Sequence, residues 1–249
     1  MLGNFVYCIF LGIDKWFIKF TMEISDFSLY SFSAQMLTIV NMFVSPISMT
    51  LYSNISRRKD YDFEIKVRRI LVVILMFVPV AIYSLEFIVT NFIARYVKTI
   101  EIISILMISQ IFLVLNTAVF VNLYKAYHKQ KDYFIRLCIS LLVAIVLDVI
   151  VALNKPNIMG YAYATMICCF FWLVMNFQYF SYMVPKAKEI LFVLVLLSIY
   201  VLIGDLNLWI RLLIYMPCYI IFVRVCMKDI WMYFIGQIEI LFGYVKNKF

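Results

Sequence analysis

Apolar segments of about the length of one membrane crossing follow one another along nearly the whole chain, separated only by short polar gaps. The hydrocarbon core of a bilayer is ~30 Å thick, and a helix needs ~20 apolar residues to cross it. Lipid offers no hydrogen-bond partners, so runs of this length can satisfy their backbone only as α-helices. Of the 249 residues, 66% are hydrophobic and 14% are charged, unlike a soluble domain. The sequence therefore predicts an all-α, polytopic transmembrane helix bundle.

The apolar pattern predicts about eight membrane spans. The connections between them are too short to form a separate soluble domain. The longest gap, residues 53–69, is rich in charged residues, and we expect a short amphipathic surface helix there. The tail beyond the last span mixes aromatic, apolar and charged residues, which is typical of an interfacial helix or a loosely attached segment. The predicted spans are residues 4–24, 29–52, 70–93, 101–124, 134–153, 158–181, 189–204 and 208–225.

Lys and Arg residues are distributed unevenly between alternate gaps. Sixteen of the 22 lie in residues 53–69, 125–136 and 182–188 and in the tail from Arg224, whereas four lie in the intervening gaps. Positively charged loops are retained on the cytoplasmic side of membranes. We therefore expect both termini in the cytoplasm, with tyrosines near the helix ends forming interfacial belts. The tyrosines assigned to these belts are Tyr30, Tyr52, Tyr96, Tyr124, Tyr161 and Tyr182.

Composition and motifs argue against several other classes of function. The net charge of +8 follows from the basic loops, so it does not indicate nucleic-acid binding. The six cysteines lack metal-ligand spacing, and His128 is the sole histidine, so the sequence contains neither a zinc motif nor a nucleophile–base pair. A Gly-rich phosphate loop is also absent. We expect no metal, no cofactor and no enzymatic chemistry, with the cysteines packing as small apolar residues.

Two stretches of the sequence carry a family resemblance. Residues 12–58 begin with an acidic–basic pair in GIDKWFIKF and continue through a short turn and YSFSAQ to the basic end SNISRR. Residues 123–176 run from the basic turn YKAYHKQK through two spans, and the second opens with IMGYAYAT, where Gly160, Ala162 and Ala164 occupy small-residue positions. In order, spacing and charge alternation these segments resemble the bacterial polysaccharide and lipid-linked oligosaccharide flippases of the MATE-like transporter superfamily.

The resemblance implies a multi-pass protein of the bacterial inner membrane. Members of the family have two six-helix lobes around a cavity, and residues 1–181 are similar to the second lobe. Residues 182–225 would add two helices, and residues 226–249 a cytoplasmic or interfacial amphipathic tail. One lobe forms only one wall of a cavity. We therefore expect pairing with a second transporter lobe or with another copy of the chain, unless the chain is a truncated relative.

An acidic and a basic residue, Asp14 and Lys15, lie in the middle of the first predicted span. Ionisable groups cost ~2.5–3.5 kcal/mol at the centre of a membrane helix, so they favour a cavity or a partner. Adjacent residues point ~100° apart around a helix, so both could line one wide cavity. Asp14 would then couple a cation or orient substrate, and Lys15 would attract the diphosphate of a lipid-linked oligosaccharide. Alternatively, they form ion pairs with a neighbouring helix or extend to the membrane surface.

Three further polar residues are candidates for the same pathway. Glu86 lies in the third predicted span, Asn116 in the fourth and Asp148 near the external end of the fifth. A buried carboxyl avoids its desolvation cost by protonation, which suits either a proton-coupled step or a hydrogen-bonded packing site. Asn116 would cross-link helices or contact sugar hydroxyls. Three prolines inside the spans predict bends: Pro46, Pro79 and Pro217.

A transporter is the main functional hypothesis. The chain would move a polyprenyl-linked oligosaccharide from the cytoplasmic to the outer leaflet for polysaccharide export, surrounded by membrane lipid and with no covalent step. A drug or cation antiporter of the same superfamily is the first alternative. An integral membrane polysaccharide polymerase or glycosyltransferase is the other, although the short external gaps leave no room for the large external loop that such enzymes favour.

Overall fold

The computed structural model describes residues 2–236, apart from the side chains of Leu2 and Phe43. Within this range the regular structure is helical throughout, which confirms the all-α class. The chain divides into two compact units, one formed by Met1–Arg68 with Ser84–Val184 and the other by Arg69–Tyr83 with the chain from Pro185. The sequence-based division into residues 1–181, 182–225 and 226–249 did not include this grouping of residues 69–83 with the later helices, and it stays a prediction.

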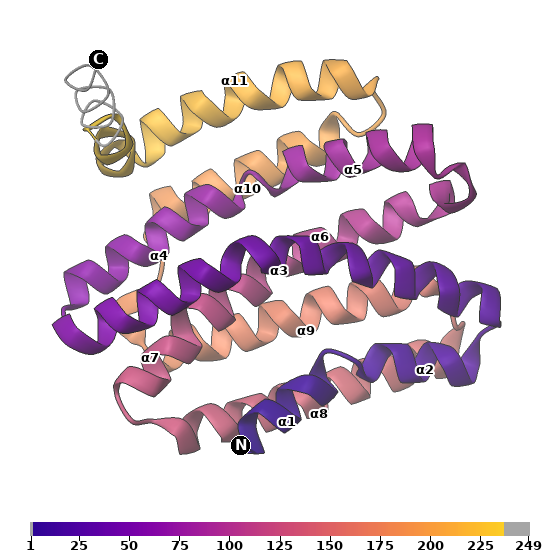
Figure 1. Ribbon diagram of the computed structural model, residues 1–249, viewed down its shortest axis with the longest axis horizontal. Coiled ribbons are helices and arrows are strands. Elements are labelled where there is room, and N and C mark those ends of the chain that lie inside the picture. The colour runs from indigo at the N-terminus through magenta and orange to yellow at the C-terminus, as the bar shows by residue number, and fades with distance from the viewer. Residues whose placement is uncertain (1, 237–249) are drawn as a thin grey trace, which may run out of the picture. The chain divides into compact units, whose positions relative to one another are not determined.

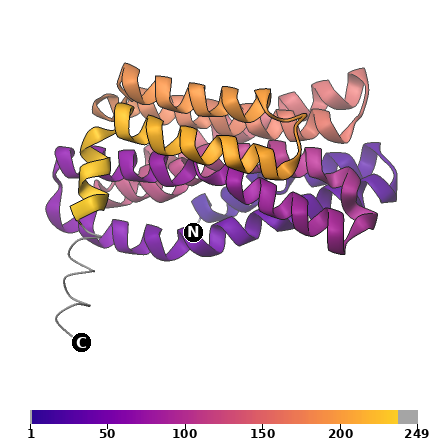
Figure 2. The same ribbon diagram turned by 90° about the horizontal axis from the view of Figure 1, so that it is seen from above.

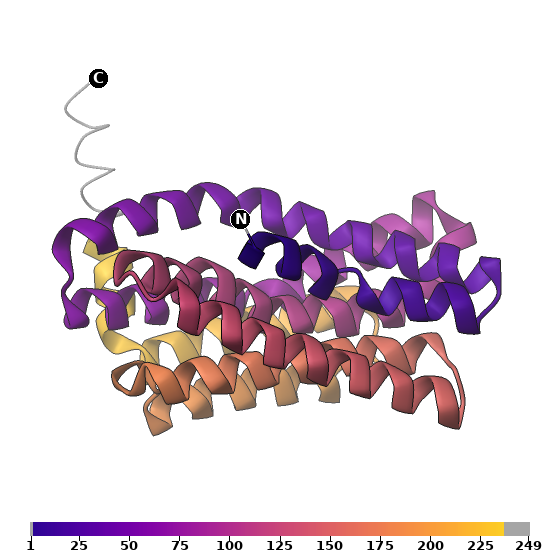
Figure 3. The ribbon, with the colours of Figure 1, turned by 90° about the horizontal axis from the view of Figure 1, so that it is seen from below.

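The first unit is built around α9 (Ile158–Tyr179), which packs along both α6 (Ile100–Val114) and α8 (Gln130–Asn154). Helix α3 (Ile24–Arg58) packs against α6, while α1 (Leu2–Phe10) and α2 (Ile13–Thr21) lie along α8 (Figures 1 and 3). One buried cluster surrounds Trp172 and another surrounds Tyr161. The shorter elements of this unit are the 3-10 helices η1 (Ala94–Thr99) and η3 (Ser181–Met183), the π-helix η2 (Leu115–Phe120) and α7 (Val121–Ala126).

Small residues at the start of α9 allow it to approach α8 closely. A Cβ atom built on Gly160 would lie 2.9 Å from Cγ1 of Val151, a distance that real side chains do not adopt. Ala162 and Ala164 are buried on the same helix. Small residues let membrane helices pack at short distance, because lipid provides no hydrophobic force to hold them together. The small-residue positions of IMGYAYAT are thus packing positions.

In the second unit, α10 (Ala187–Leu202) and α11 (Leu208–Cys226) pack side by side (Figure 2). This unit also contains the end of α4 (Tyr61–Leu75) and the start of α5 (Val78–Phe92). A turn at Met76 and Phe77 separates these two helices. Pro79 accounts for the break, because its nitrogen carries no hydrogen to donate to the Leu75 carbonyl four residues earlier. The helix is interrupted before Pro79, while residues 61–92 together remain one stretch long enough to cross a membrane.

Two tyrosines of α11 satisfy the carbonyl groups that this interruption releases. In a continuous helix the Val73 carbonyl would accept from the Phe77 N–H, and the Met76 carbonyl from the Val80 N–H. At the turn these two N–H groups instead donate to carbonyls three residues earlier in the chain, so the Val73 and Met76 carbonyls lose their usual donors. The Tyr219 hydroxyl donates to the Val73 carbonyl at 2.9 Å, and the Tyr215 hydroxyl donates to the Met76 carbonyl at 2.7 Å. Lipid cannot solvate a carbonyl, so these two hydroxyls stabilise the broken span.

Five helical stretches within residues 2–236 are long and apolar enough to cross a membrane, or six if the bent helix α3 counts as one span. In order, these six correspond to all the predicted spans except the first and the seventh. Residues 4–24 are divided between α1 and α2, with a turn at Leu11 and Gly12, and α10 has 16 residues. The predicted membrane-spanning class therefore stands. The first predicted span is divided into two short helices, and the seventh has the 16 residues that were predicted, fewer than the ~20 of a full crossing.

The remaining prolines have different effects. Helix α3 bends by 44° between Ile24–Met42 and Val44–Arg58. Pro46 lies four residues beyond Met42, so the Met42 carbonyl has no N–H partner and is crowded by the proline ring. The bend predicted there is confirmed. Pro217 lies within α11, which is assigned as one helix over its whole length.

The short surface helix predicted in residues 53–69 is wrong. Helix α3 continues to Arg58 and α4 begins at Tyr61, so only two residues separate two long helices. Lys59 adopts the left-handed conformation (φ 46°, ψ 48°) that ends α3. Arginines in the last turn of α3 and acidic residues in the first turn of α4 complement the helix dipoles, so both helices extend through the charged segment. In the tail, residues 228–236 are helical, and residues 237–249 lie outside the described range.

The interfacial belt was predicted wrongly for three of its tyrosines. Tyr30 and Tyr161 are fully buried, and Tyr124 is 1% exposed. Each hydroxyl has a protein partner: Tyr30 donates to Asp14, Tyr124 donates to Asn176 at 3.0 Å, and Tyr161 shares a hydrogen bond of 2.8 Å with Thr21. A tyrosine near a helix end is stable at the interface or in a core that supplies a partner, and here the core supplies one.

At one end of the first unit a buried carboxylate joins three segments. Glu64 of α4 is 1% exposed and accepts hydrogen bonds from Tyr127 at 2.8 Å and from Tyr182 at 2.5 Å. Tyr182 also packs against Tyr61, with ring centroids 4.5 Å apart. Burial, together with the Glu64 carboxylate, raises the pKa of the Tyr182 phenol, so this hydroxyl remains a donor. The turns before α8 and α10 are thereby attached to the start of α4.

We expect Tyr215→Phe to destabilise the protein by about 1–3 kcal/mol, because the Met76 carbonyl would remain buried without a donor. Thermal unfolding of the purified protein in detergent micelles measures this loss. The matched control is Tyr163→Phe, since Tyr163 is 47% exposed and its removal should change stability by less than about 0.5 kcal/mol. Equal stability of the two variants would show that the hydroxyl does not support the broken span.

Candidate functional site

Asp14 lies in the first turn of α2, directly after the turn that interrupts the first span. The first N–H groups of a helix have no partners within the helix and carry partial positive charge. One oxygen of the Asp14 carboxylate accepts from the backbone N–H of Lys15 at 2.7 Å. Gly12, at the N-cap, has no side chain that could do so. The interruption of the span therefore creates a place where a carboxylate is stabilised deep among apolar helices.

Side chains from two other helices complete the surroundings of this carboxylate. The second Asp14 oxygen accepts hydrogen bonds from the Tyr30 hydroxyl of α3 and from the Thr165 hydroxyl of α9, the latter at 3.2 Å. Asp14 itself is 7% exposed. The carboxylate thus links α2, α3 and α9 through three donors, and its orientation is fixed by groups that lie far apart in the sequence.

A cavity of about 170 Å³ adjoins this cluster inside the first unit. Its apolar wall comes from Phe10 at the end of α1, from Leu11 in the following turn and from leucines of α3 and α6. The Gln110 side chain is 4% exposed, and its amide oxygen has no hydrogen-bond partner among residues 2–236. An unpaired buried acceptor can bind a donor from a ligand or water. The polar residues that line the cavity are Asp14, Lys15, Thr38, Asn41, Ser109, Gln110 and Thr165.

Lys15 brings a positive charge to the same cavity. Its side chain is half-buried, and within the described residues no carboxylate lies within ion-pair distance of its ammonium group. Asp14 and Lys15 are adjacent in sequence, and both line this one cavity. The arrangement can attract an anionic or hydroxyl-rich group, because it offers a cation, the Gln110 acceptor and several hydroxyls in an apolar setting.

Asp148 lies in a second, much smaller cavity of about 10 Å³ next to the first. The residue belongs to α8 and is 2% exposed. Thr165 and Phe10 line both cavities, so the cavity beside Asp14 adjoins the one beside Asp148. The structure thereby brings together two carboxyls that are 134 positions apart in the sequence.

Asn116 and Glu86 lie outside these two cavities. Asn116 is fully buried in the π-helix η2, where it donates to the Cys169 carbonyl at 3.1 Å and accepts from Asn176 at 2.9 Å. Its hydrogen bonds connect η2 to α9, which is the cross-linking alternative predicted for it. Glu86 is half-buried on α5, and its backbone carbonyl accepts from Thr90 at 2.6 Å.

Sequence reasoning missed three residues of this site: Tyr30, Thr165 and Gln110. Tyr30 was assigned to the interface because of its position near a helix end. Thr165 closes the segment IMGYAYAT, which was interpreted only through its small residues. Gln110 is the one amide side chain in the apolar helix α6, and a polar group of this size in an apolar helix is a detectable signal. Within residues 2–236, no group of three potential ligands from His, Cys, Asp and Glu could hold a metal ion.

We predict that Asp14→Leu destabilises the protein by about 2–3 kcal/mol more than Asp14→Asn. An asparagine keeps an oxygen that accepts from Tyr30 and Thr165, whereas a leucine leaves both hydroxyls and the first turn of α2 without their acceptor. Unfolding of the two variants in the same detergent measures the difference. Identical stabilities would mean that the carboxylate does not organise the three helices.

Comparison with solved structures identifies a similar fold. The structure of the lipid II flippase MurJ in an inward closed conformation matches with a TM-score of 0.70 and 22% sequence identity. The match covers 92% of this chain and 52% of the flippase, so the chain spans about half the length of that protein. No family model and no curated protein matches the sequence. The chain therefore has the fold found in about half of a polytopic helical membrane transporter.

Proposed function

We propose that this chain is a membrane transporter, or one lobe of a transporter, that moves a lipid-linked saccharide between the leaflets of a bacterial inner membrane. The observation that carries the proposal is the polar cavity beside Asp14 and Lys15, enclosed by apolar helices whose fold is like that of a lipid II flippase. A flippase must hide a charged headgroup from hydrocarbon, and only a polar surface within the bundle can do this. Covalent chemistry is not required.

Lys15 and Asp14 have different roles in this proposal. The Lys15 ammonium would bind the diphosphate that joins the saccharide to its polyprenyl chain, because a strongly anionic group needs a cationic contact in an apolar setting. Asp14 would orient the substrate or couple its movement to a cation, and Asp148 would contribute to the same step from the adjoining cavity. Asn116 would keep α9 in position. Glu86, on α5, would line a different part of the pathway.

The cavity is too small for a complete headgroup. Pockets that enclose small ligands typically hold ~300–1,000 Å³, whereas this one holds about 170 Å³. The chain also spans about half the length of the flippase it resembles. We infer that a second lobe, or a second copy of this chain, would enlarge the cavity and alternate its access by rocking against the first. Polyprenyl-linked oligosaccharides for surface polysaccharide are the substrates we favour.

A drug or cation antiporter of the same superfamily is the second candidate. The buried carboxyls of Asp14 and Asp148 favour it, since carboxyls are the groups that bind and release cations in membrane proteins. The cationic Lys15 in the same cavity argues for an anionic substrate instead. Transport assays with both substrate types therefore distinguish the candidates.

We predict that Lys15→Gln slows movement of a diphosphate-linked saccharide lipid about tenfold, through the loss of about 1.5 kcal/mol of charge-assisted binding. The assay uses vesicles that contain the full chain, alone or with a candidate first lobe, and a fluorescent substrate whose outer-leaflet fraction is read by a membrane-impermeant reductant. Lys19→Gln is the matched control, because Lys19 is exposed on the same helix and lies over the Trp16 ring at 5.5 Å.

Two results would contradict the proposal. One is the absence of substrate movement both in vesicles with the chain alone and in vesicles that also contain a candidate first lobe. The other is an equal rate for the Lys15 and Lys19 variants. Export of a cationic dye without movement of the saccharide lipid would instead support the antiporter.

The charge pattern also predicts a defined orientation. Reporter fusions after Arg58, Lys131 and Lys186 should report the cytoplasm, whereas fusions after Asn157 and Leu206 should report the opposite side. A phosphatase that is active only outside the cytoplasm and a fluorescent protein that folds only inside provide the two readouts. Reversed signals at the basic turns would overturn the proposed direction of transport.

A further inference from the structure

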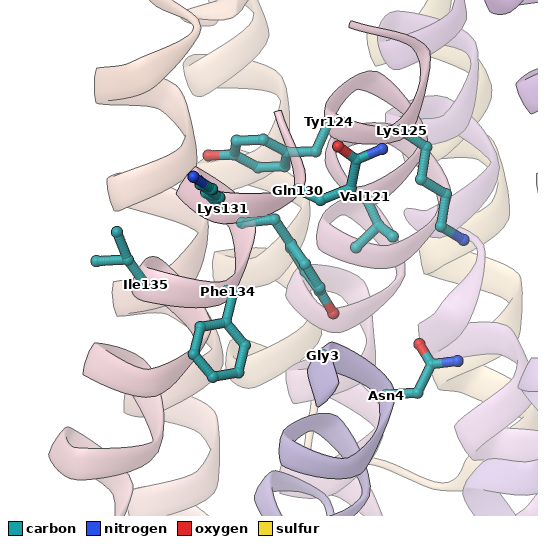
Figure 4. A pocket seen from close by; sticks show the side chains of 10 residues that line it. Gly3, Asn4, Val121, Tyr124, Lys125, Gln130, Lys131, Phe134 and Ile135 are labelled. Carbon is teal, nitrogen blue, oxygen red and sulfur yellow. The ribbon is translucent and has the colours of Figure 1, made fainter. Parts of the chain in front are cut away.

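The first unit also contains a pocket that is separate from the polar site. It has a volume of about 860 Å³ and lies between α1, α7 and the start of α8 (Figure 4). Nothing in the proposed transport mechanism uses it. Its volume falls in the range of ~300–1,000 Å³ that is typical of ligand pockets. The charged and apolar side chains that line the pocket indicate which class of ligand it could bind.

The polar part of this pocket is cationic. Lys125 comes from α7 and Lys131 from α8, and none of the ten lining residues is acidic. The acidic residue nearest in sequence, Asp132, accepts a hydrogen bond from Tyr179 of α9 at 2.7 Å and does not line the pocket. In Figure 4, Gln130 lies between the two lysines, and the Lys125 side chain extends toward the side where Asn4 is found. An anionic group at the pocket would be attracted by a lysine on each side of Gln130.

The rest of the pocket is apolar and continues onto the surface of α8. Val121, Phe134 and Ile135 line it, together with the rings of Tyr124 and Tyr133. From Ile135 the outward face of α8 continues as an exposed apolar stripe at helical spacing, with exposed fractions of 56%, 39%, 62% and 57% at Ile135, Ile139, Leu142 and Val146. An acyl chain that leaves the pocket would remain in contact with hydrocarbon side chains along this stripe.

The location of the pocket fits a lipid better than a soluble ion. It opens beside the turn before α8, in the basic gap that the distribution of Lys and Arg places on the cytoplasmic side. Basic pockets between membrane helices on that side bind anionic lipid headgroups. A free phosphate would use the lysines but not the apolar wall.

From these observations we infer that the pocket binds an anionic glycerophospholipid of the surrounding leaflet. The headgroup phosphate lies between Lys125 and Lys131, and an acyl chain follows the stripe on α8. This lipid would be bound to the outside of the first unit and would join α1 to the α7–α8 turn. The inference does not depend on the proposed transport function.

Native mass spectrometry of the full chain in detergent tests this inference with phosphatidylglycerol and phosphatidylcholine. We expect selective binding of phosphatidylglycerol, and a loss of about fivefold in affinity for each lysine replaced, which is about 25-fold for Lys125→Gln with Lys131→Gln. Lys129→Gln is the matched control, because Lys129 is exposed in the same turn but does not line the pocket. Its affinity should stay within about twofold of the original protein.

Each other outcome overturns the inference. Equal binding of the two lipids would show that the headgroup charge is not recognised. An equal loss in the Lys129 variant would show that the basic turn acts as a diffuse surface charge and not as a pocket. Displacement of bound phosphatidylglycerol by inorganic phosphate alone would identify a soluble anion as the ligand. Circular dichroism of every variant verifies that the helical fold is intact.

Discussion

The interaction on which this structure depends is the backbone hydrogen bond in a medium without water. A continuous helix satisfies that requirement by itself, but a broken helix does not. Where the third span is interrupted before Pro79, the hydroxyls of Tyr215 and Tyr219 replace the missing donors. Where the first span is interrupted, the Asp14 carboxylate accepts from the start of α2. Each of these two breaks is therefore accompanied by a side chain that completes the hydrogen bonding.

The candidate site is a consequence of the same constraint. A carboxylate at a helix start is favourable electrostatically, yet among apolar helices it needs further donors. Tyr30 and Thr165 supply them from α3 and α9. Once these groups are fixed, Lys15 and the unpaired amide oxygen of Gln110 remain available on the neighbouring cavity. Asp14, Tyr30 and Thr165 thus hold the helices together, whereas Lys15 and Gln110 are able to bind a ligand.

The sequence predicted the fold class well and the site only in part. Within residues 2–236, hydrophobic runs identified five helices that are long enough to span a membrane, or six with the bent helix α3, because length and composition are local properties. Asp14 and Lys15 were recognisable because charges are rare in such runs. Tyr30 was not, because a tyrosine near a helix end fits both an interface and a core. Asn116 was recognised as polar, but its partners Cys169 and Asn176 lie on α9, more than 50 residues away.

From the residues alone it follows that lipid surrounds the helices, that the chain is helical and that Lys and Arg gather in alternate gaps. Each of these properties depends on the composition of a short segment or on a comparison of the gaps between spans. Tertiary packing decided the rest. It placed Asp14, Asp148 and Thr165 around two adjoining cavities, converted interfacial tyrosines into buried donors and formed the basic pocket between α1, α7 and α8. These features require helices far apart in sequence to meet at particular rotations. Apolar periodicity does not specify those rotations, because lipid accepts an apolar face as readily as another helix does.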